Sequence, residues 1–139
     1  MTKSQREQHA RDLAAEHGIE IRLTAYDLGI PVRPGDASGC AHGDFVELCT
    51  PRGWTADAYF AALHEIGHCV LGHARNGRST PAYRADIMRA EIETWLWAAE
   101  RALELSVRAR TFAVSCAATY ARDYGGHGAV EELRVALNV

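Results

Sequence analysis

The sequence predicts a mostly helical α+β fold, with a few short strands and a single domain that spans residues 1–139. Apolar residues alternate with polar ones in one short segment near residue 20, and they recur at helical spacing in longer segments further along the chain. Hydrophobic residues make up 47% and charged residues 24% of the chain, a balance typical of one folded domain rather than of a disordered chain.

The first expected helix covers residues 3–17, where Ala, Leu, Lys, Arg, Glu and Gln favour helix formation. Gly18 follows it directly and suits a C-terminal cap. In the next segment Ile19, Ile21 and Leu23 alternate with polar residues. This period of two predicts a half-buried strand.

Residues 28–43 hold two prolines and four glycines, so we expect an irregular loop there. A second strand is expected at residues 44–49, DFVELC, because apolar and β-branched side chains return. The Thr-Pro-Arg-Gly run at residues 50–53 predicts a turn.

From Thr55 onward the apolar period changes to 3.6, which predicts a helix with Thr55 as its N-cap and Gly72 at its end. A polar loop should follow, and then a long helix from about residue 84 to 105. A third helix is expected near residues 107–124, before a pair of glycines, and residues 130–137 should add a last turn or two.

The expected helix after Thr55 contains His64 and His68, four residues apart in the run HEIGH. Side chains at this spacing share a helix face, so both imidazoles can reach one ion roughly 2 Å away. Glu65 would lie beside that ion, where its carboxylate can take a proton from metal-bound water as this water attacks a carbonyl. The pattern predicts a Zn²⁺ site with Glu65 as general base; the alternative is two solvent-facing histidines on an amphipathic helix.

A catalytic zinc needs a third protein ligand and one position open for water. His73 is a candidate, since HEIGHCVLGH approaches the metzincin pattern HExxHxxGxxH, but its spacing is one residue short. His73 would also face away from His64 unless the chain turns at Gly72. The other candidates are Glu91 and Glu93 on the next helix, which would make a gluzincin site.

HEIGHCVLGH and the later EIETWLWA together resemble the ImmA/IrrE family of zinc metallopeptidases, whose pattern is roughly HExGHxxLGH and then ExEAxxFA. The resemblance covers about residues 44–100. It implies a minimal zincin-like fold in which a short mixed sheet packs beside the HExxH helix. The strand at residues 44–49 would form the edge of this sheet, where an extended substrate could add as another strand.

By this resemblance Glu91 is the third metal ligand, together with His64 and His68. Glu93 lies about 200° further around the helix and would be a supporting residue or a surface charge. Trp95 continues the buried stripe of Glu91, which also favours the first glutamate.

Two residues depart from the family pattern: Thr94 stands where alanine is usual, and Trp97 where phenylalanine is usual. The departures bear on the subfamily rather than on the metal site. Tyr83, Arg84 and His73 are candidates for stabilising the transition state, because the oxyanion needs a donor outside the three ligands.

These features predict a zinc-dependent endopeptidase, a hydrolase that cleaves a specific protein. The resemblance implies a regulatory substrate, such as a repressor of a phage or mobile element. No residues remain for a helix-turn-helix module, so a DNA-binding target would be a separate protein. The alternative is a zinc-containing regulatory or protein-binding module that does not cleave. A ribonuclease using three histidines is disfavoured by their spacing and by the acidic balance of the chain.

Eighteen Asp and Glu outnumber fifteen Lys and Arg, so we expect no direct nucleic-acid partner. Apolar runs are too short for a membrane span and no signal segment is seen, which predicts a cytoplasmic protein without a membrane partner. The four cysteines form no C-x-x-C pair and should be reduced. A second metal cluster of Cys40, His42 and Cys49 is a minor alternative.

Overall fold

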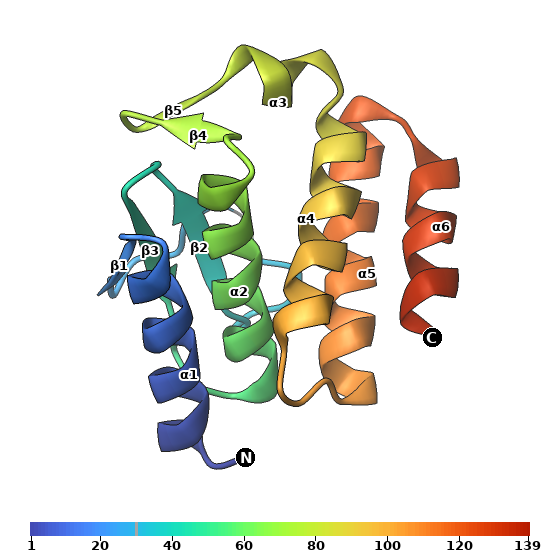
Figure 1. Cartoon of the computed structure of the whole chain (residues 1–139). Helices are drawn as coiled ribbons and strands as arrows, with labels where there is room; N and C mark the ends of the chain where they lie inside the picture. Colours follow the sequence, from blue (N-terminus) through green and yellow to red (C-terminus); the bar gives the residue numbers. More distant parts are fainter. Residues whose placement is uncertain (30) are drawn as a thin grey trace.

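The computed structural model describes residues 1–29 and 31–139. These residues form six helices, a three-stranded sheet and a two-stranded sheet (Figure 1). The predicted class, mostly helical α+β with a small mixed sheet beside the motif helix, is confirmed. The elements in chain order are α1 (Lys3–Glu16), β1 (Glu20–Leu23), β2 (Ser38–Ala41), β3 (Phe45–Cys49), α2 (Ala56–Val70), β4 (Ala74–Arg75), β5 (Arg78–Ser79), α3 (Pro81–Ala85), α4 (Ile87–Arg101), α5 (Val107–Tyr124) and α6 (His127–Leu137).

Helix α2 lies at the centre of the molecule, between α1 and the sheet on one side and α4 and α5 on the other (Figure 1). Thr55 caps it as expected, since its hydroxyl accepts a hydrogen bond from the Ala58 amide. Phe60, Leu63 and Ile66 are fully buried and belong to one hydrophobic core that takes in residues from α1 to α6. Among the described residues, no helix has both the length and the apolar character needed to cross a bilayer.

The three-stranded sheet has the order β1-β3-β2, with β1 parallel and β2 antiparallel to β3. Two expectations were wrong here. Residues 28–43 are not irregular throughout, because they contain β2, and the strand expected at residues 44–49 is central rather than at the edge. The small residues of β2 give no strand signal of their own; a tight turn, in which the His42 amide donates to the Phe45 carbonyl, folds them onto β3.

The segment between α2 and α4 is more ordered than the expected polar loop. It forms the β4–β5 hairpin, turned at Asn76-Gly77, and the short helix α3. The long helix expected from residue 84 begins instead at Ile87, because Asp86 leaves helical geometry and its carboxylate caps the Arg89 amide. The last helix, α6, is longer than the turn or two expected, since it starts at His127.

Helix α4 packs directly on the backbone of α2 at Gly67. An ideal Cβ built on Gly67 would lie 2.9 Å from Thr94 Cγ2 and 2.9 Å from Trp97 Cε3, inside the normal contact distance of carbon atoms. No side chain therefore fits between the two helices at this point. The contact brings Glu91, one turn before Thr94, toward the turns of α2 that carry the histidines.

Gly67→Ala should lower the free energy of unfolding by about 1–3 kcal/mol, because the added methyl group overpacks the contact of α2 with α4. Urea denaturation followed by circular dichroism measures this change.

The matched control is Gly128→Ala in α6, where a Cβ meets nothing within 4 Å. This substitution should leave stability unchanged or raise it by up to about 1 kcal/mol. A Gly67→Ala variant as stable as the control would show that α4 does not need the bare backbone of α2.

Candidate metal centre

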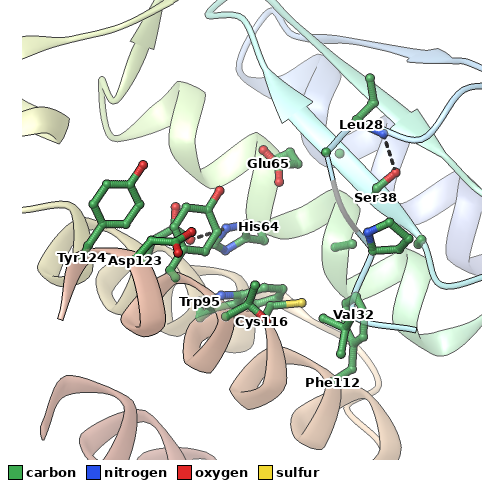
Figure 2. Close-up of a pocket in the computed structure, with 18 residues that line it drawn as sticks. Leu28, Val32, Ser38, His64, Glu65, Trp95, Phe112, Cys116, Asp123 and Tyr124 are labelled. Carbon is green, nitrogen blue, oxygen red and sulfur yellow. Dashed lines mark hydrogen bonds and ion pairs between the residues drawn. The ribbon is translucent and has the colours of Figure 1, made fainter. Parts of the chain in front are cut away.

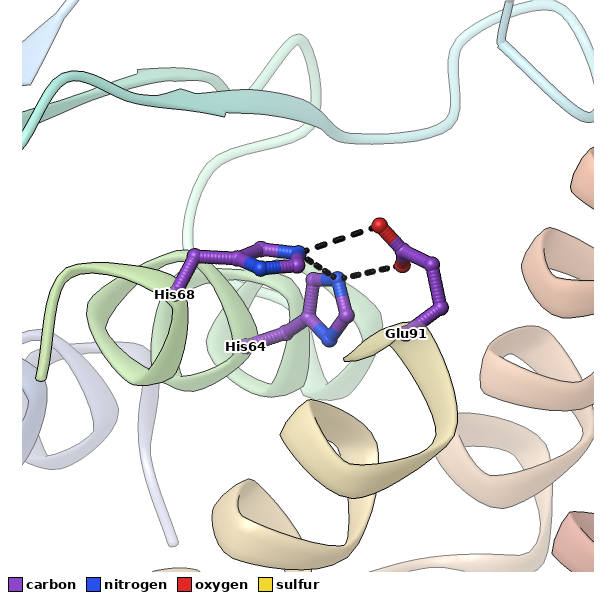
Figure 3. Close-up of side chains that lie close together, drawn as sticks. All are labelled: His64, His68 and Glu91. Atoms are coloured by element: carbon purple, nitrogen blue, oxygen red, sulfur yellow. Dashed lines mark hydrogen bonds and ion pairs between the residues drawn. The ribbon is translucent and has the colours of Figure 1, made fainter. Parts of the chain in front are cut away.

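His64, His68 and Glu91 converge in the buried contact between α2 and α4 (Figure 3). The two imidazole Nε2 atoms lie 3.0 Å apart. His64 Nε2 is 3.1 Å from Glu91 Oε2, and His68 Nε2 is 3.2 Å from Glu91 Oε1. The three side chains thus form a group that could hold a metal ion.

The spacing of these donor atoms fits a small tetrahedral ion. Ligand atoms about 2 Å from such an ion, in tetrahedral directions, lie about 3.3 Å from one another. The three measured separations, 3.0, 3.1 and 3.2 Å, are close to this value. Three protein donors also leave a fourth tetrahedral direction free.

Glu91 is held as an anion. Burial by itself opposes its charge, but the neighbouring His64 and His68 outweigh burial and keep the Glu91 pKa well below its ordinary value. The Tyr83 hydroxyl donates a hydrogen bond to Glu91 Oε1 at 2.7 Å. Burial, together with the Glu91 charge, raises the pKa of Tyr83, so Tyr83 keeps its proton and remains a donor.

His68 is supported from behind by His73. The chain turns sharply at Gly72, whose φ is 76°, and this turn brings His73 back against α2. The Nδ1 atoms of His68 and His73 lie 3.0 Å apart, and Thr94 Oγ1 lies 3.2 Å from His73 Nδ1. His73 is therefore not part of the metal-binding group but contacts the opposite side of the His68 ring.

The proton on this contact can be assigned from chemistry. An imidazole that directs Nε2 to a metal ion carries its proton on Nδ1, so His68 Nδ1 donates and His73 Nδ1 accepts. Burial and the neighbouring His68 lower the pKa of His73, which favours the neutral ring that this role needs.

The His64 ring is oriented by stacking on Trp95 rather than by a hydrogen bond at its Nδ1 atom. Its ring lies 3.8 Å from the Trp95 ring, centroid to centroid, at an interplanar angle of 23°. His64 Nδ1 is buried without a hydrogen-bond partner in the described part of the chain. Trp95 thus belongs to the wall of the site, as the sequence suggested for a residue on the buried stripe of Glu91.

Glu65 lies beside the metal-binding group, under strand β2. An ideal Cβ on Gly39 would lie 2.6 Å from Glu65 Cγ, so the strand backbone touches this side chain directly. Burial raises the pKa of Glu65, although the nearby His64 and His68 oppose the rise. Its position matches the expectation for a general base, and its catalytic role stays a prediction.

Two hollows meet at this point and form one cleft, which we call the large hollow and the small hollow. Their volumes are about 330 and 140 Å³. Both are lined by Gly39, Glu65, Glu91 and Tyr120, so the acidic side chains lie where the hollows join. Figure 2 shows the large hollow, with His64 and Glu65 between Asp123 and Tyr124 on one side and Val32 and Phe112 on the other.

Several other candidates lie outside the cleft. Glu93 is exposed, on the far side of α4 from Glu91. Arg84 is also exposed, donates to the Ser79 carbonyl and lines neither hollow; its support of the transition state stays a prediction.

The four cysteines are free, as expected. Cys40 and Cys49 do not form a metal cluster with His42, whose Nε2 lies 2.7 Å from Glu47 Oε1 instead. Within residues 1–29 and 31–139, His64, His68 and Glu91 form the one group of three or more His, Cys, Asp or Glu side chains that could hold a metal ion.

Three residues of the site were not foreseen in these roles. Thr94 appeared only as a departure from the family pattern, yet it is fully buried and its hydroxyl donates to the Ala90 carbonyl at 2.6 Å. Gly39 gave no signal because its strand was not expected; it lies against Glu65, where a Cβ would be only 2.6 Å from Glu65 Cγ. Tyr120 lines both hollows from α5, and no local pattern distinguishes it from a surface tyrosine.

No protein-family model, no curated protein and no solved structure matches this chain. The resemblance of its motifs to the ImmA/IrrE family stays a prediction from the sequence. The residues of the cleft and their geometry therefore carry the functional proposal.

Glu91→Gln should weaken Zn²⁺ binding by more than the roughly 10- to 100-fold typical of a supporting residue, because it removes the only anion among the three donors. Competition of metal-free protein with a chromophoric chelator measures this affinity. Glu93→Gln is the matched control, two residues away and exposed, and should bind Zn²⁺ like the parent. Equal losses in both variants would mean that the site does not distinguish the two glutamates.

His73→Ala should weaken Zn²⁺ binding by about 10- to 100-fold, since the His68 ring loses the acceptor that orients it. The same chelator competition applies, and His127→Ala, at an exposed histidine, serves as the control. Unchanged affinity in folded His73→Ala protein would show that Thr94 and packing alone orient His68.

Proposed function

We propose that this chain is a zinc-dependent endopeptidase in which His64, His68 and Glu91 hold Zn²⁺ and Glu65 is the general base. The observation that carries the proposal is the position of Glu65, at the junction of an open cleft and beside three converging buried donors. A purely structural metal site would be closed by a fourth protein ligand and would need no free carboxylate next to it.

The donor set supports zinc as the metal. Two imidazoles and one carboxylate form the ligand set of known zinc peptidases, which leave one position for water. A zinc ion held by these residues would lower the pKa of a bound water toward about 7 and would polarise the carbonyl that is attacked. Hard cations such as Mg²⁺ prefer oxygen ligands, which this site does not supply in sufficient number.

Glu65 would take a proton from the attacking water and pass it to the nitrogen of the leaving amine. Burial under β2 raises the pKa of this carboxylate above its ordinary value, and a raised pKa makes the carboxylate a stronger proton acceptor. The Tyr83 hydroxyl lines the small hollow and is a candidate to stabilise the developing oxyanion; its single proton is donated to Glu91 Oε1 in this structure, so this role requires that the hydroxyl turn from Glu91 to the oxyanion. His73 also lines the small hollow, but its contact with His68 suits it better to orienting that ligand.

Strand β2 offers a place for an extended substrate. In the described part of the chain no strand pairs with its outer edge. The His42 amide donates a hydrogen bond to the Phe45 carbonyl. Because hydrogen-bonded and non-hydrogen-bonded pairs alternate along an antiparallel ladder, the N–H and C=O groups of Gly39 and Ala41 point away from β3. A peptide that pairs with these groups would cross the cleft directly over Glu65. We therefore assign the pairing with an extended substrate to β2, and not to the strand at residues 44–49 for which it was expected.

The substrate class follows from this mode of binding. Main-chain pairing requires an unfolded or extended segment, so the substrate is a protein with an exposed loop or linker. Together with the resemblance of the motifs, this favours a regulatory protein such as a repressor as the target, and a cytoplasmic location for the reaction.

Glu65→Gln should reduce peptide-bond cleavage by about 100- to 10,000-fold while Zn²⁺ binding is retained, because the amide cannot accept the proton. Incubation with a denatured proteome, followed by mass spectrometry of new termini, measures cleavage, and chelator competition measures the metal. Persistent cleavage in the variant would remove Glu65 as the base. A zinc-loaded parent protein that yields no new termini would favour the binding module that does not cleave.

A further inference from the structure

The two hollows of the cleft differ in chemistry as well as in size. The large hollow is walled mainly by apolar side chains, among them Val32, Ala61, Trp95, Phe112 and Cys116. The small hollow is lined by polar groups, which include those of His73, Ser79 and Tyr83. The two sides of the reacting bond would therefore meet different surroundings.

Strand β2 gives the cleft a direction. Ala37, Ser38 and Gly39 line the large hollow, whereas Gly39, Cys40 and Ala41 line the small one. The strand therefore runs from the large hollow to the small hollow and passes Glu65 at Gly39, where the two meet.

A peptide antiparallel to β2 would run the opposite way. Its N-terminal part would lie along Cys40 and Ala41 at the small hollow, and its C-terminal part along Ala37 and Ser38 at the large one. Antiparallel pairing is favoured because its hydrogen bonds are straight and slightly more stable per residue than those of parallel strands.

We infer that the large hollow receives a large apolar side chain from the substrate residue immediately after the scissile bond, an inference that rests on the proposed peptidase function. His64, Glu65 and Glu91 themselves line the hollow, so a side chain next to the reacting carbonyl can enter it directly. Its volume of about 330 Å³ leaves room for a Leu, Met or Phe side chain together with the adjoining main chain.

Charge narrows the substrate further. The ionisable carboxylates that line the large hollow are those of Glu65, Glu91 and Asp123, and its lining includes no Lys or Arg among the described residues. An acidic side chain would be desolvated there without a partner, so Asp and Glu after the scissile bond are excluded.

Cleavage-site profiling tests this specificity. Zinc-loaded protein is incubated with a peptide library, and mass spectrometry identifies the residues on each side of every cleaved bond. Leu, Met and Phe should be enriched at least about tenfold over Gly immediately after the bond, and Asp and Glu should be absent. Cleavage without such a preference would overturn the inference while the peptidase function stood.

A matched pair of variants tests the direction. Cys116→Phe fills the large hollow and should shift the residue after the bond toward Gly and Ala, with kcat/KM for a Leu peptide at least about tenfold lower. Ser79→Phe, at an exposed residue that lines the small hollow and not the large one, should alter selection before the bond only. If the variant in the large hollow altered selection before the bond and the variant in the small hollow altered selection after it, the peptide would lie parallel to β2. Val32→Trp, at a partly exposed wall residue, replaces Cys116→Phe if the latter does not fold.

A binding measurement keeps the inference testable without turnover. Two succinyl hydroxamates, one with an isobutyl side chain and one without, both chelate zinc and extend toward the side of the leaving amine. Calorimetry on the zinc-loaded protein should give at least about tenfold tighter binding of the isobutyl compound, and Cys116→Phe should abolish the difference. Equal affinities would overturn the inference. The expected difference in a protein that cleaves nothing would instead refute the proposed peptidase function and leave the apolar subsite intact.

Discussion

The close contact of α4 with the bare backbone of α2 at Gly67 sets the geometry on which the site depends. His64 and His68 come from one helix, and a single helix cannot bring a third donor to the same point while it leaves space for solvent. Glu91 reaches both histidines because no side chain separates the helices at Gly67. Thr94 is fully buried and packs against this glycine, since a Cβ on Gly67 would lie 2.9 Å from Thr94 Cγ2. The distances between the donor atoms of α2 and α4 thus depend on a packing contact that contains none of these donor atoms.

Burial of two imidazoles and a carboxylate is costly unless their remaining polar atoms are satisfied. Tyr83 donates to Glu91, and His73 contacts His68, so each of these two groups has an outer partner. Both partners arrive through breaks in the helical pattern. Gly72 turns the chain after α2, and Asp86 separates α3 from α4. The short elements between the two long helices therefore serve the site, although they add little to the core.

The site is enclosed by helices on one side and open on the other. Trp95 and the α4 backbone close the side of the site that faces α4 and keep out water that would compete for the donors. On the opposite side the donors line the cleft directly, and the contact at Gly39 holds the Glu65 side chain against β2. Gly67 thus allows α4 to approach α2 closely, and Gly39 allows β2 to approach α2 closely from the other side. This asymmetry is what a hydrolytic centre needs, since the donors must be rigid and the substrate must enter.

The sequence by itself determined the features that depend on local order. The 3.6-residue period located α2, helix-forming composition before Gly18 located α1, and a glycine pair marked the end of α5. The spacing of His64 and His68 placed them on one face, period-two alternation found β1, and apolar composition found β3. The tertiary structure alone decided the rest. Strand β2 has no propensity of its own and exists because β3 is beside it; it therefore took the edge position expected for residues 44–49. Likewise, the position of His73 behind His68, rather than among the donors, depends on the turn at Gly72 and on the arrival of α4. Residues distant in the chain decide such features, and no local pattern records which partner a strand or side chain will meet.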